Sequence, residues 1–141
     1  MRPRICAVIV DNDIDAVHDV ESRVDLFEVR MDLIGAGWRE VVKQLGKPWI
    51  ACNRSASEGG KAGKNRIDEL LEASELGADI VDLELRTKGL EEIVPRIKKK
   101  SKCLLSYHNL KNTLSLSELG KIVEAQLKAG ADICKVVTTA H

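Results

Sequence analysis

The segment "ELGADIVDLEL" at residues 75–85 contains a pattern that recurs later in the chain and that indicates a class of fold. A polar stretch closes on Gly77, and an apolar run then begins, which is the pattern of a helix end followed by a strand. The segment "LKAGADICKVV" at residues 127–137 repeats it, with Gly-Ala-Asp-Ile again leading into the apolar run. Such recurrence of one helix–strand unit favours a barrel of repeated βα units.

Strand-like and helix-like patterns alternate along the rest of the chain. Strands are expected at residues 5–10, 25–33, 48–53, 78–86, 102–109 and 131–138, and helices at 11–22, 37–46, 64–77, 89–101 and 115–130, with an interruption near Pro95 and a loop at 54–63. Because the crossovers have helix length, the pattern predicts parallel strands in an α/β fold. A doubly wound open sheet is the alternative, but the first turn, "DNDID" at 11–15, lacks the glycines of a nucleotide site.

Composition narrows the function classes. A length of 141 residues predicts one domain. The chain has 22 basic and 22 acidic residues, and 3% of its residues are aromatic. A zero net charge and few aromatic rings argue against nucleic acid and anionic membranes as partners. No apolar run reaches the ~18–20 residues that span a bilayer, and no signal-peptide cleavage site follows residues 5–10. A cytoplasmic protein is therefore expected.

Four cysteines, Cys6, Cys52, Cys103 and Cys134, lie in strand-like runs without the spacing of a zinc or redox motif. They are predicted to be reduced core residues. No metal and no cofactor is expected.

Polar side chains interrupt five of the expected strands near their carboxyl ends, where parallel α/β folds bind ligands. They are Glu28, Arg30 and Asp32; Asn53, Arg54 and, in the following loop, Glu58; Asp82, Glu84 and Arg86; Ser106 and His108; and Lys135. Strands of a parallel sheet are normally apolar throughout, and buried charges need a partner or a function. These side chains are therefore expected to converge on one site.

Each of these signals also has an ordinary structural explanation. Glu28 and Arg30 could form a structural ion pair, His108 could be a satisfied core or surface histidine, and Glu58-Gly59-Gly60 could be a flexible turn. Lys135 could extend its amino group past the strand end into water. However, it is flanked by apolar residues, and burial would lower its pKa toward that of a neutral amine that attacks a carbonyl. A lysine, a histidine, carboxylates and arginines together predict a site for an anionic carbonyl compound.

Five segments in order resemble the type I 3-dehydroquinate dehydratases, which are Schiff-base enzymes of the shikimate pathway. They are "EVRMD" at 28–32, "NRSASEGG" at 53–60, "VDLEL" at 81–85, "SYH" at 106–108 and "ICKVVTTA" at 133–140. The resemblance covers essentially the whole chain. It implies a (βα)8 barrel, a homodimer and dehydration of 3-dehydroquinate to 3-dehydroshikimate, the third step of aromatic amino acid biosynthesis.

The resemblance also implies roles for the polar residues. Lys135 would form an imine with the substrate ketone, and His108 would remove the adjacent proton and then protonate the leaving hydroxyl. Glu58 would hold the protonation state of His108. Further substrate-binding residues are expected to be Glu28, Arg30, Arg54, Asp82 and Glu84.

Length is the main departure from the family. The chain ends at His141, six residues past Lys135, whereas the family continues through two more strands with the arginine that binds the substrate carboxylate. Residues 1–141 are therefore expected to form a single, incomplete βα-barrel domain of about six units. The alternative to an active dehydratase is an inactive fragment or ligand-binding remnant. Another lysine-imine barrel, such as an aldolase, is a third possibility.

Overall fold

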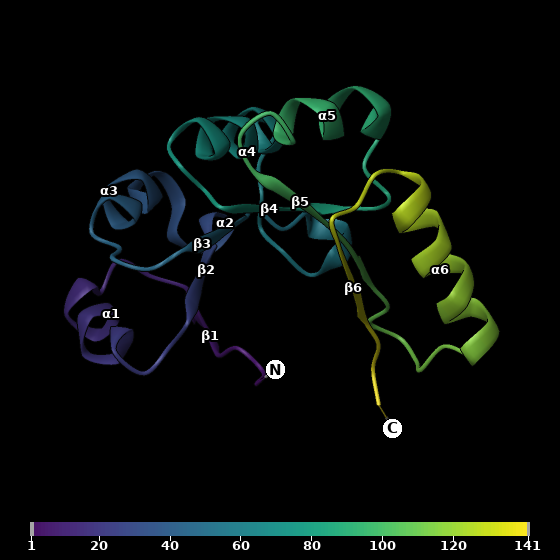
Figure 1. The fold of residues 1–141 in the computed structure, drawn as a ribbon, viewed down its shortest axis with the longest axis horizontal. Coiled ribbons are helices and arrows are strands. Elements are labelled where there is room, and N and C mark those ends of the chain that lie inside the picture. The colour runs from purple at the N-terminus through teal and green to yellow at the C-terminus, as the bar shows by residue number, and fades with distance from the viewer. Residues whose placement is uncertain (1, 141) are drawn as a thin grey trace.

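The computed structural model describes residues 2–140 as six parallel strands curled into an open half-barrel, with helices along its outer side (Figure 1). The strands are β1 (Cys6–Ile9), β2 (Leu26–Arg30), β3 (Trp49–Cys52), β4 (Ile80–Glu84), β5 (Lys102–His108) and β6 (Ile133–Val137). They lie in chain order, whereas a doubly wound sheet reverses its order at a switch point. The barrel-type prediction is confirmed.

Helices connect the strands on the outer side. They are α1 (Ile14–Glu21), α2 (Met31–Ile34), α3 (Trp38–Lys43), α4 (Arg66–Glu75), α5 (Leu90–Ile97) and α6 (Leu116–Lys128), with 3-10 turns η1 (Gly35–Gly37) and η2 (Ala56–Glu58). The first helix begins at Ile14, three residues later than expected, and is capped by Asp13. At the start of α6, Ser115 forms a capping box with Glu118.

The repeated Gly-Ala-Asp-Ile segment has a structural role in both its copies. Gly77 and Gly130 follow helix ends with φ of 99° and 98°, a left-handed conformation that glycine adopts without strain. The next aspartate then reaches the preceding strand: Asp79 accepts a bond from the Trp49 amide at 3.0 Å, and Asp132 accepts one from the Cys103 amide at 2.8 Å. The repeat therefore closes each helix and binds the start of a neighbouring strand.

Alternation along the strands separates two apolar layers. Side chains such as Phe27, Val29, Val81 and Leu83 are completely buried in the main core cluster, which also contains helix residues. Inside the curl, Leu26, Ile50, Ile80 and Leu104 form a second, smaller cluster, against which Ile133 packs. This inner cluster forms a floor beneath the polar residues nearer the strand ends.

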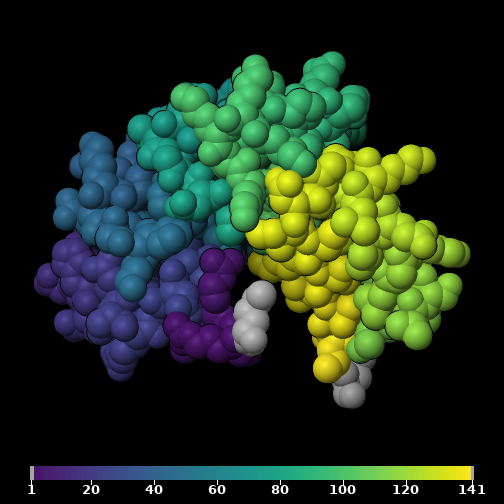
Figure 2. Space-filling view, viewed as in Figure 1, coloured from purple at the N-terminus to yellow at the C-terminus, as the bar shows by residue number. Residues whose placement is uncertain are grey.

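The concave side of the half-barrel is open between its first and last strands. Figure 2 shows the gap between the N-terminal segment in purple and the C-terminal segment in yellow. Val8 on β1 is 53% exposed, and every residue of β6 is only partly buried. Cys6, on the edge strand β1, is exposed, so the prediction that it is a core residue is wrong. Cys52 and Cys103 are buried, as predicted.

All six strands are shorter than predicted, and two of them end at least two residues before their expected ends. The second ends at Arg30, the last residue paired with β3, so Asp32 lies in the helical turn α2 and not on the strand. The fourth ends at Glu84, which leaves Arg86 in the following turn. In both cases a charged residue still occurs at every second position of the sequence after the backbone pairing between the strands has ended.

The expected interruption near Pro95 is also wrong, because α5 runs through it to Ile97. Proline removes one backbone donor from a helix interior. Pro95 is on the exposed side of α5, where water can bind the carbonyl that loses its partner.

Candidate functional site

Lys135 extends from β6 toward carboxylates of two other strands. Its amino nitrogen lies 3.4 Å from Glu28 Oε2 and 3.4 Å from Asp82 Oδ2, and its side chain is 31% exposed. Alternation on β2, β4 and β6 places all three side chains inside the curl. The sequence prediction that these residues converge is therefore confirmed.

The expected direction of the Lys135 pKa is wrong. Burial lowers it, as anticipated, but the charges of Asp82 and Glu28 outweigh burial and raise the pKa above its ordinary value. Flanking residues in the sequence cannot reveal partners contributed by distant strands. The free lysine is consequently an ammonium ion at neutral pH.

Asp82 belongs to a buried network centred on Arg54. The Arg54 guanidinium donates to both Asp82 oxygens, at 3.1 and 2.6 Å, and to Ser106 Oγ at 2.8 Å. Ser106 in turn donates to Asp82 Oδ1 at 2.5 Å. Burial opposes ionisation of Asp82, but the Arg54 charge and hydrogen bonds lower its pKa. Asp82 is therefore a carboxylate fixed beneath the lysine.

Glu84, the last residue of β4, extends this network to the carboxyl end of the strand. It lies 3.2 Å from Arg54, pairs with Arg66 and accepts the Ser55 amide at 3.0 Å. The Arg54 and Glu84 side chains are only 5% and 4% exposed. Their charges are therefore directed at each other and at neighbouring protein groups.

His108 and Glu58 form a second pair at the end of β5. Glu58 Oε2 lies 2.8 Å from His108 Nδ1 and accepts the His108 amide at 3.0 Å. Burial would raise the pKa of Glu58, but hydrogen bonds from His108 and Arg86 lower it. An ionised carboxylate only accepts, so Nδ1 carries the proton, and Nε2 is free to accept one when the ring is neutral.

The glycines after Glu58 shape its turn. A Cβ atom on Gly60 would overlap the Arg54 carbonyl oxygen, so only glycine permits this close return of the loop. The Gly60 amide donates to Ser55 at 2.8 Å, and the Ala62 amide donates to Arg54 at 3.0 Å. This compact turn brings Glu58 under His108.

Arg30 and Asp32 pair beside the lysine site. The guanidinium donates to both Asp32 oxygens, at 2.9 and 2.8 Å, and Asp32 also accepts the Lys61 amide at 3.0 Å. Asp32, although off the strand, therefore orients Arg30, whose side chain is 20% exposed.

Residues 2–140 contain neither a cluster of metal-binding side chains nor a helix that could span a membrane. Among these residues, no three or more histidine, cysteine or carboxylate side chains gather as a metal ion would require. Within the same range, no helix has both the length and the apolar character needed to cross a membrane.

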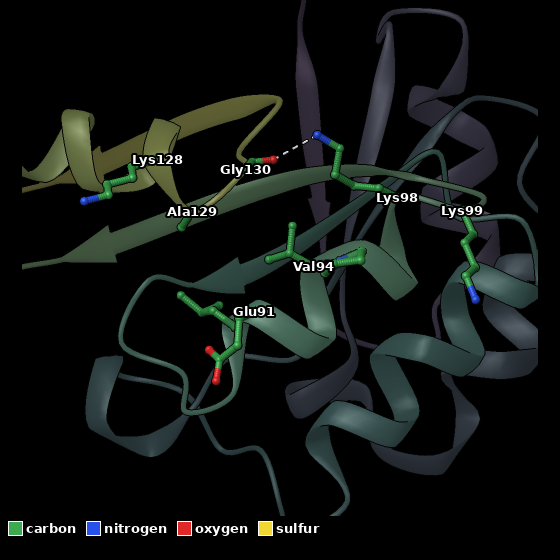
Figure 3. Close-up of a pocket in the computed structure, with 9 residues that line it drawn as sticks. Glu91, Val94, Lys98, Lys99, Lys128, Ala129 and Gly130 are labelled. Carbon is green, nitrogen blue, oxygen red and sulfur yellow. Dashed lines mark hydrogen bonds between the residues drawn. The ribbon is translucent and has the colours of Figure 1, made fainter.

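A groove of about 490 Å³ runs between α5 and the turn from α6 to β6 (Figure 3). Val94 and Ala129 contribute to its apolar lining, and Lys98 donates to the Gly130 carbonyl at 3.0 Å. It belongs to the outer helical layer, and none of the charged pairs described above lines it.

The family model for type I 3-dehydroquinase matches residues 5–141. The chain belongs to the type I 3-dehydroquinase family. A 3-dehydroquinate dehydratase of Dehalococcoides mccartyi is 38% identical over 141 residues, covering 98% of this chain and 64% of the relative. One of Methanococcus maripaludis is 33% identical over 97% of this chain and 67% of the relative. The chain thus spans about two thirds of the length of these relatives.

Solved structures of the type I 3-dehydroquinase family agree with the fold. The crystal structure of 3-dehydroquinate dehydratase from Aquifex aeolicus superposes with a TM-score of 0.84 at 26% identity, covering 97% of this chain and 68% of that one. The structure from Geobacillus kaustophilus gives a TM-score of 0.79 at 25% identity, with 98% and 62% covered.

Proposed function

We propose that the chain dehydrates 3-dehydroquinate to 3-dehydroshikimate through a Schiff base on Lys135. The observation that carries the proposal is that Lys135 and His108 lie on adjacent paired strands, with Ser106 opposite Lys135 and His108 two residues further on. Glu58, from the turn η2, lies 2.8 Å from His108 Nδ1. Because side chains two apart share a face, the amine and the imidazole serve one site. The substrate is inferred from the relatives, which are named 3-dehydroquinate dehydratases.

The reaction would begin with proton loss from the Lys135 ammonium and attack of the amine on the substrate ketone. Loss of water from that adduct leaves the imine, which acidifies the neighbouring carbon and accepts its electrons. His108 takes the proton at Nε2 and returns it to the departing hydroxyl, which leaves as water. Hydrolysis of the imine then releases 3-dehydroshikimate and restores the amine.

The remaining predicted site residues fall into two groups, those with partly exposed side chains and those with buried side chains. Glu28 and Arg30, with side chains 14% and 20% exposed, would contact substrate hydroxyls. Arg54 and Glu84 are almost fully buried, and we assign them to holding Asp82, which in turn fixes the Lys135 amine. The homodimer, the cytoplasmic location and the single incomplete barrel domain stay predictions.

Formation of 3-dehydroshikimate by the purified chain tests this function. Lys135→Ala should abolish turnover, whereas Lys102→Ala, which removes an exposed lysine at the start of β5, should not change it. His108→Ala should slow dehydration severely and still allow imine formation. Full turnover by the Lys135→Ala variant would refute the proposal, and ligand binding without turnover in the parent chain would favour the ligand-binding alternative.

A further inference from the structure

Arg86 contacts both members of the His108–Glu58 pair from the turn after β4. Its Nε donates to Glu58 Oε1 at 3.0 Å, and its Nη2 donates to the His108 carbonyl at 2.7 Å. The guanidinium also lies 4.4 Å from the centre of the Tyr107 ring, within the range of a cation–π contact. Three contacts thus fix a side chain that is 52% exposed.

These contacts divide the Glu58 carboxylate between two partners. Oε1 binds Arg86, while Oε2 faces His108 Nδ1 at 2.8 Å and accepts the His108 amide at 3.0 Å. If the carboxylate turned, Oε2 would leave Nδ1, and the imidazole proton could move to Nε2. Since Glu58 is 1% exposed, water cannot easily replace Arg86 as the donor to Oε1.

We propose that Arg86 is a positioning residue that holds Glu58 in the orientation that keeps the His108 proton on Nδ1. Nε2 of the neutral ring is then always available to accept a proton. That this benefits catalysis rests on the proposed dehydratase function, whereas the effect on the imidazole proton follows from the contacts alone.

The chain contains a matched control for this arginine. Arg39, like Arg86, pairs with a carboxylate and lies beside an aromatic ring: it donates through Nε and Nη2 to the two oxygens of Glu72 and lies 4.6 Å from the centre of the Trp38 ring. The Glu72 side chain is 41% exposed, and neither partner contacts His108. Arg39→Met therefore removes an arginine–carboxylate pair and a cation–π contact, as Arg86→Met does, without touching the histidine pair.

Nitrogen NMR of the imidazole rings tests the proposal directly, because protonated and bare ring nitrogens have distinct shifts. Spectra of the full chain are recorded at about pH 8, above the ordinary titration range of histidine. His108→Ala identifies the His108 signals among those of the three histidines. In the parent and in Arg39→Met, Nδ1 should be protonated. Arg86→Met should shift both His108 nitrogens toward the averaged values of mixed tautomers, and Arg86→Lys should restore part of the difference.

Unchanged His108 nitrogen shifts in Arg86→Met would overturn the proposal. Where turnover is measurable, Arg86→Met should lower kcat by up to about 100-fold with little change in KM, because the base is misplaced while the substrate contacts remain. A parent chain without turnover would count against the proposed function alone, since the tautomer comparison still decides the role of Arg86.

Discussion

The amino nitrogen of Lys135 lies 3.4 Å from a carboxylate oxygen of Glu28, which precedes it by 107 positions in the chain. Their strands, β6 and β2, are separated by three others in the sheet, and the curl brings their inner faces together. With Asp82 at the same distance, this contact raises the lysine pKa despite burial. The lysine is therefore held in place as a cation before any substrate binds.

Removing one carboxylate should make the lysine easier to deprotonate. Glu28→Gln removes one of the two carboxylates that counter the effect of burial on the Lys135 pKa, so that pKa should fall relative to the parent. The measurement is the pH dependence of acetylation at Lys135, resolved by peptide mass spectrometry, which needs no substrate. The Lys135 profile should move to lower pH.

Glu75→Gln is the control for this experiment, because Glu75 pairs with Lys100 on the surface, where its side chain is 65% exposed. It should leave the Lys135 profile in place. An unchanged profile in Glu28→Gln would show that Glu28 does not govern the charge of the lysine.

Loss of Arg54 should destabilise the fold strongly. Arg54→Ala leaves Asp82 and Glu84 buried without their shared cation, and breaking a buried pair in this way costs about 3–5 kcal/mol. Urea unfolding measures the difference. Arg2→Ala, which removes an arginine 75% exposed from its pair with Asp25, should change the unfolding free energy far less than Arg54→Ala does, because water screens this surface pair. Equal effects of the two substitutions would contradict the structural importance of the Arg54 network.

Acid should destabilise the chain through Asp82 and Glu58. Both pKa values are lowered in the folded state, so the unfolded chain binds protons first, near the ordinary values of 3.8 for Asp82 and 4.5 for Glu58. Their contribution to stability is complete above those values and is lost as the pH falls through the lower, folded ones. Urea midpoints at a series of pH values from neutral to acidic should therefore fall steadily.

Glu58→Gln should make this decline shallower, because one of the two groups no longer titrates. The surface variant Glu75→Gln serves again for comparison and should retain the slope of the parent. If acidification left the urea midpoint of the parent unchanged, the carboxylates would not stabilise the fold as described.

Much of the fold could be predicted from local patterns, because a βα unit is encoded within its own residues. Gly77 and Gly130 mark helix ends, and the capping box at Ser115 marks a helix start. Strand ends were harder to predict: the alternation of Glu28, Arg30 and Asp32 continues past the last backbone pair, at Arg30 with Cys52. Where pairing ends depends on the partner strand, which the local pattern does not contain.

The site shows the same division between local and distant information. Polar residues at strand ends predicted that Lys135, Glu28 and Asp82 would meet, because parallel strands end at one edge of a sheet. The shift of the Lys135 pKa was predicted in the wrong direction, since it depends on two carboxylates from distant strands. Arg86 was expected on the strand, and its contact with Glu58 depends on a turn that the alternation did not predict.

The most direct test of the Schiff-base assignment is the intact mass of the chain after borohydride reduction with 3-dehydroquinate or 3-dehydroshikimate present. The reduced imine cannot hydrolyse, so a reactive lysine retains the ligand, and peptide sequencing locates it. We predict one adduct per chain, on Lys135, and none in Lys135→Ala. An unmodified chain, or an adduct on a surface lysine such as Lys102, would contradict the assignment of Lys135 as the nucleophile.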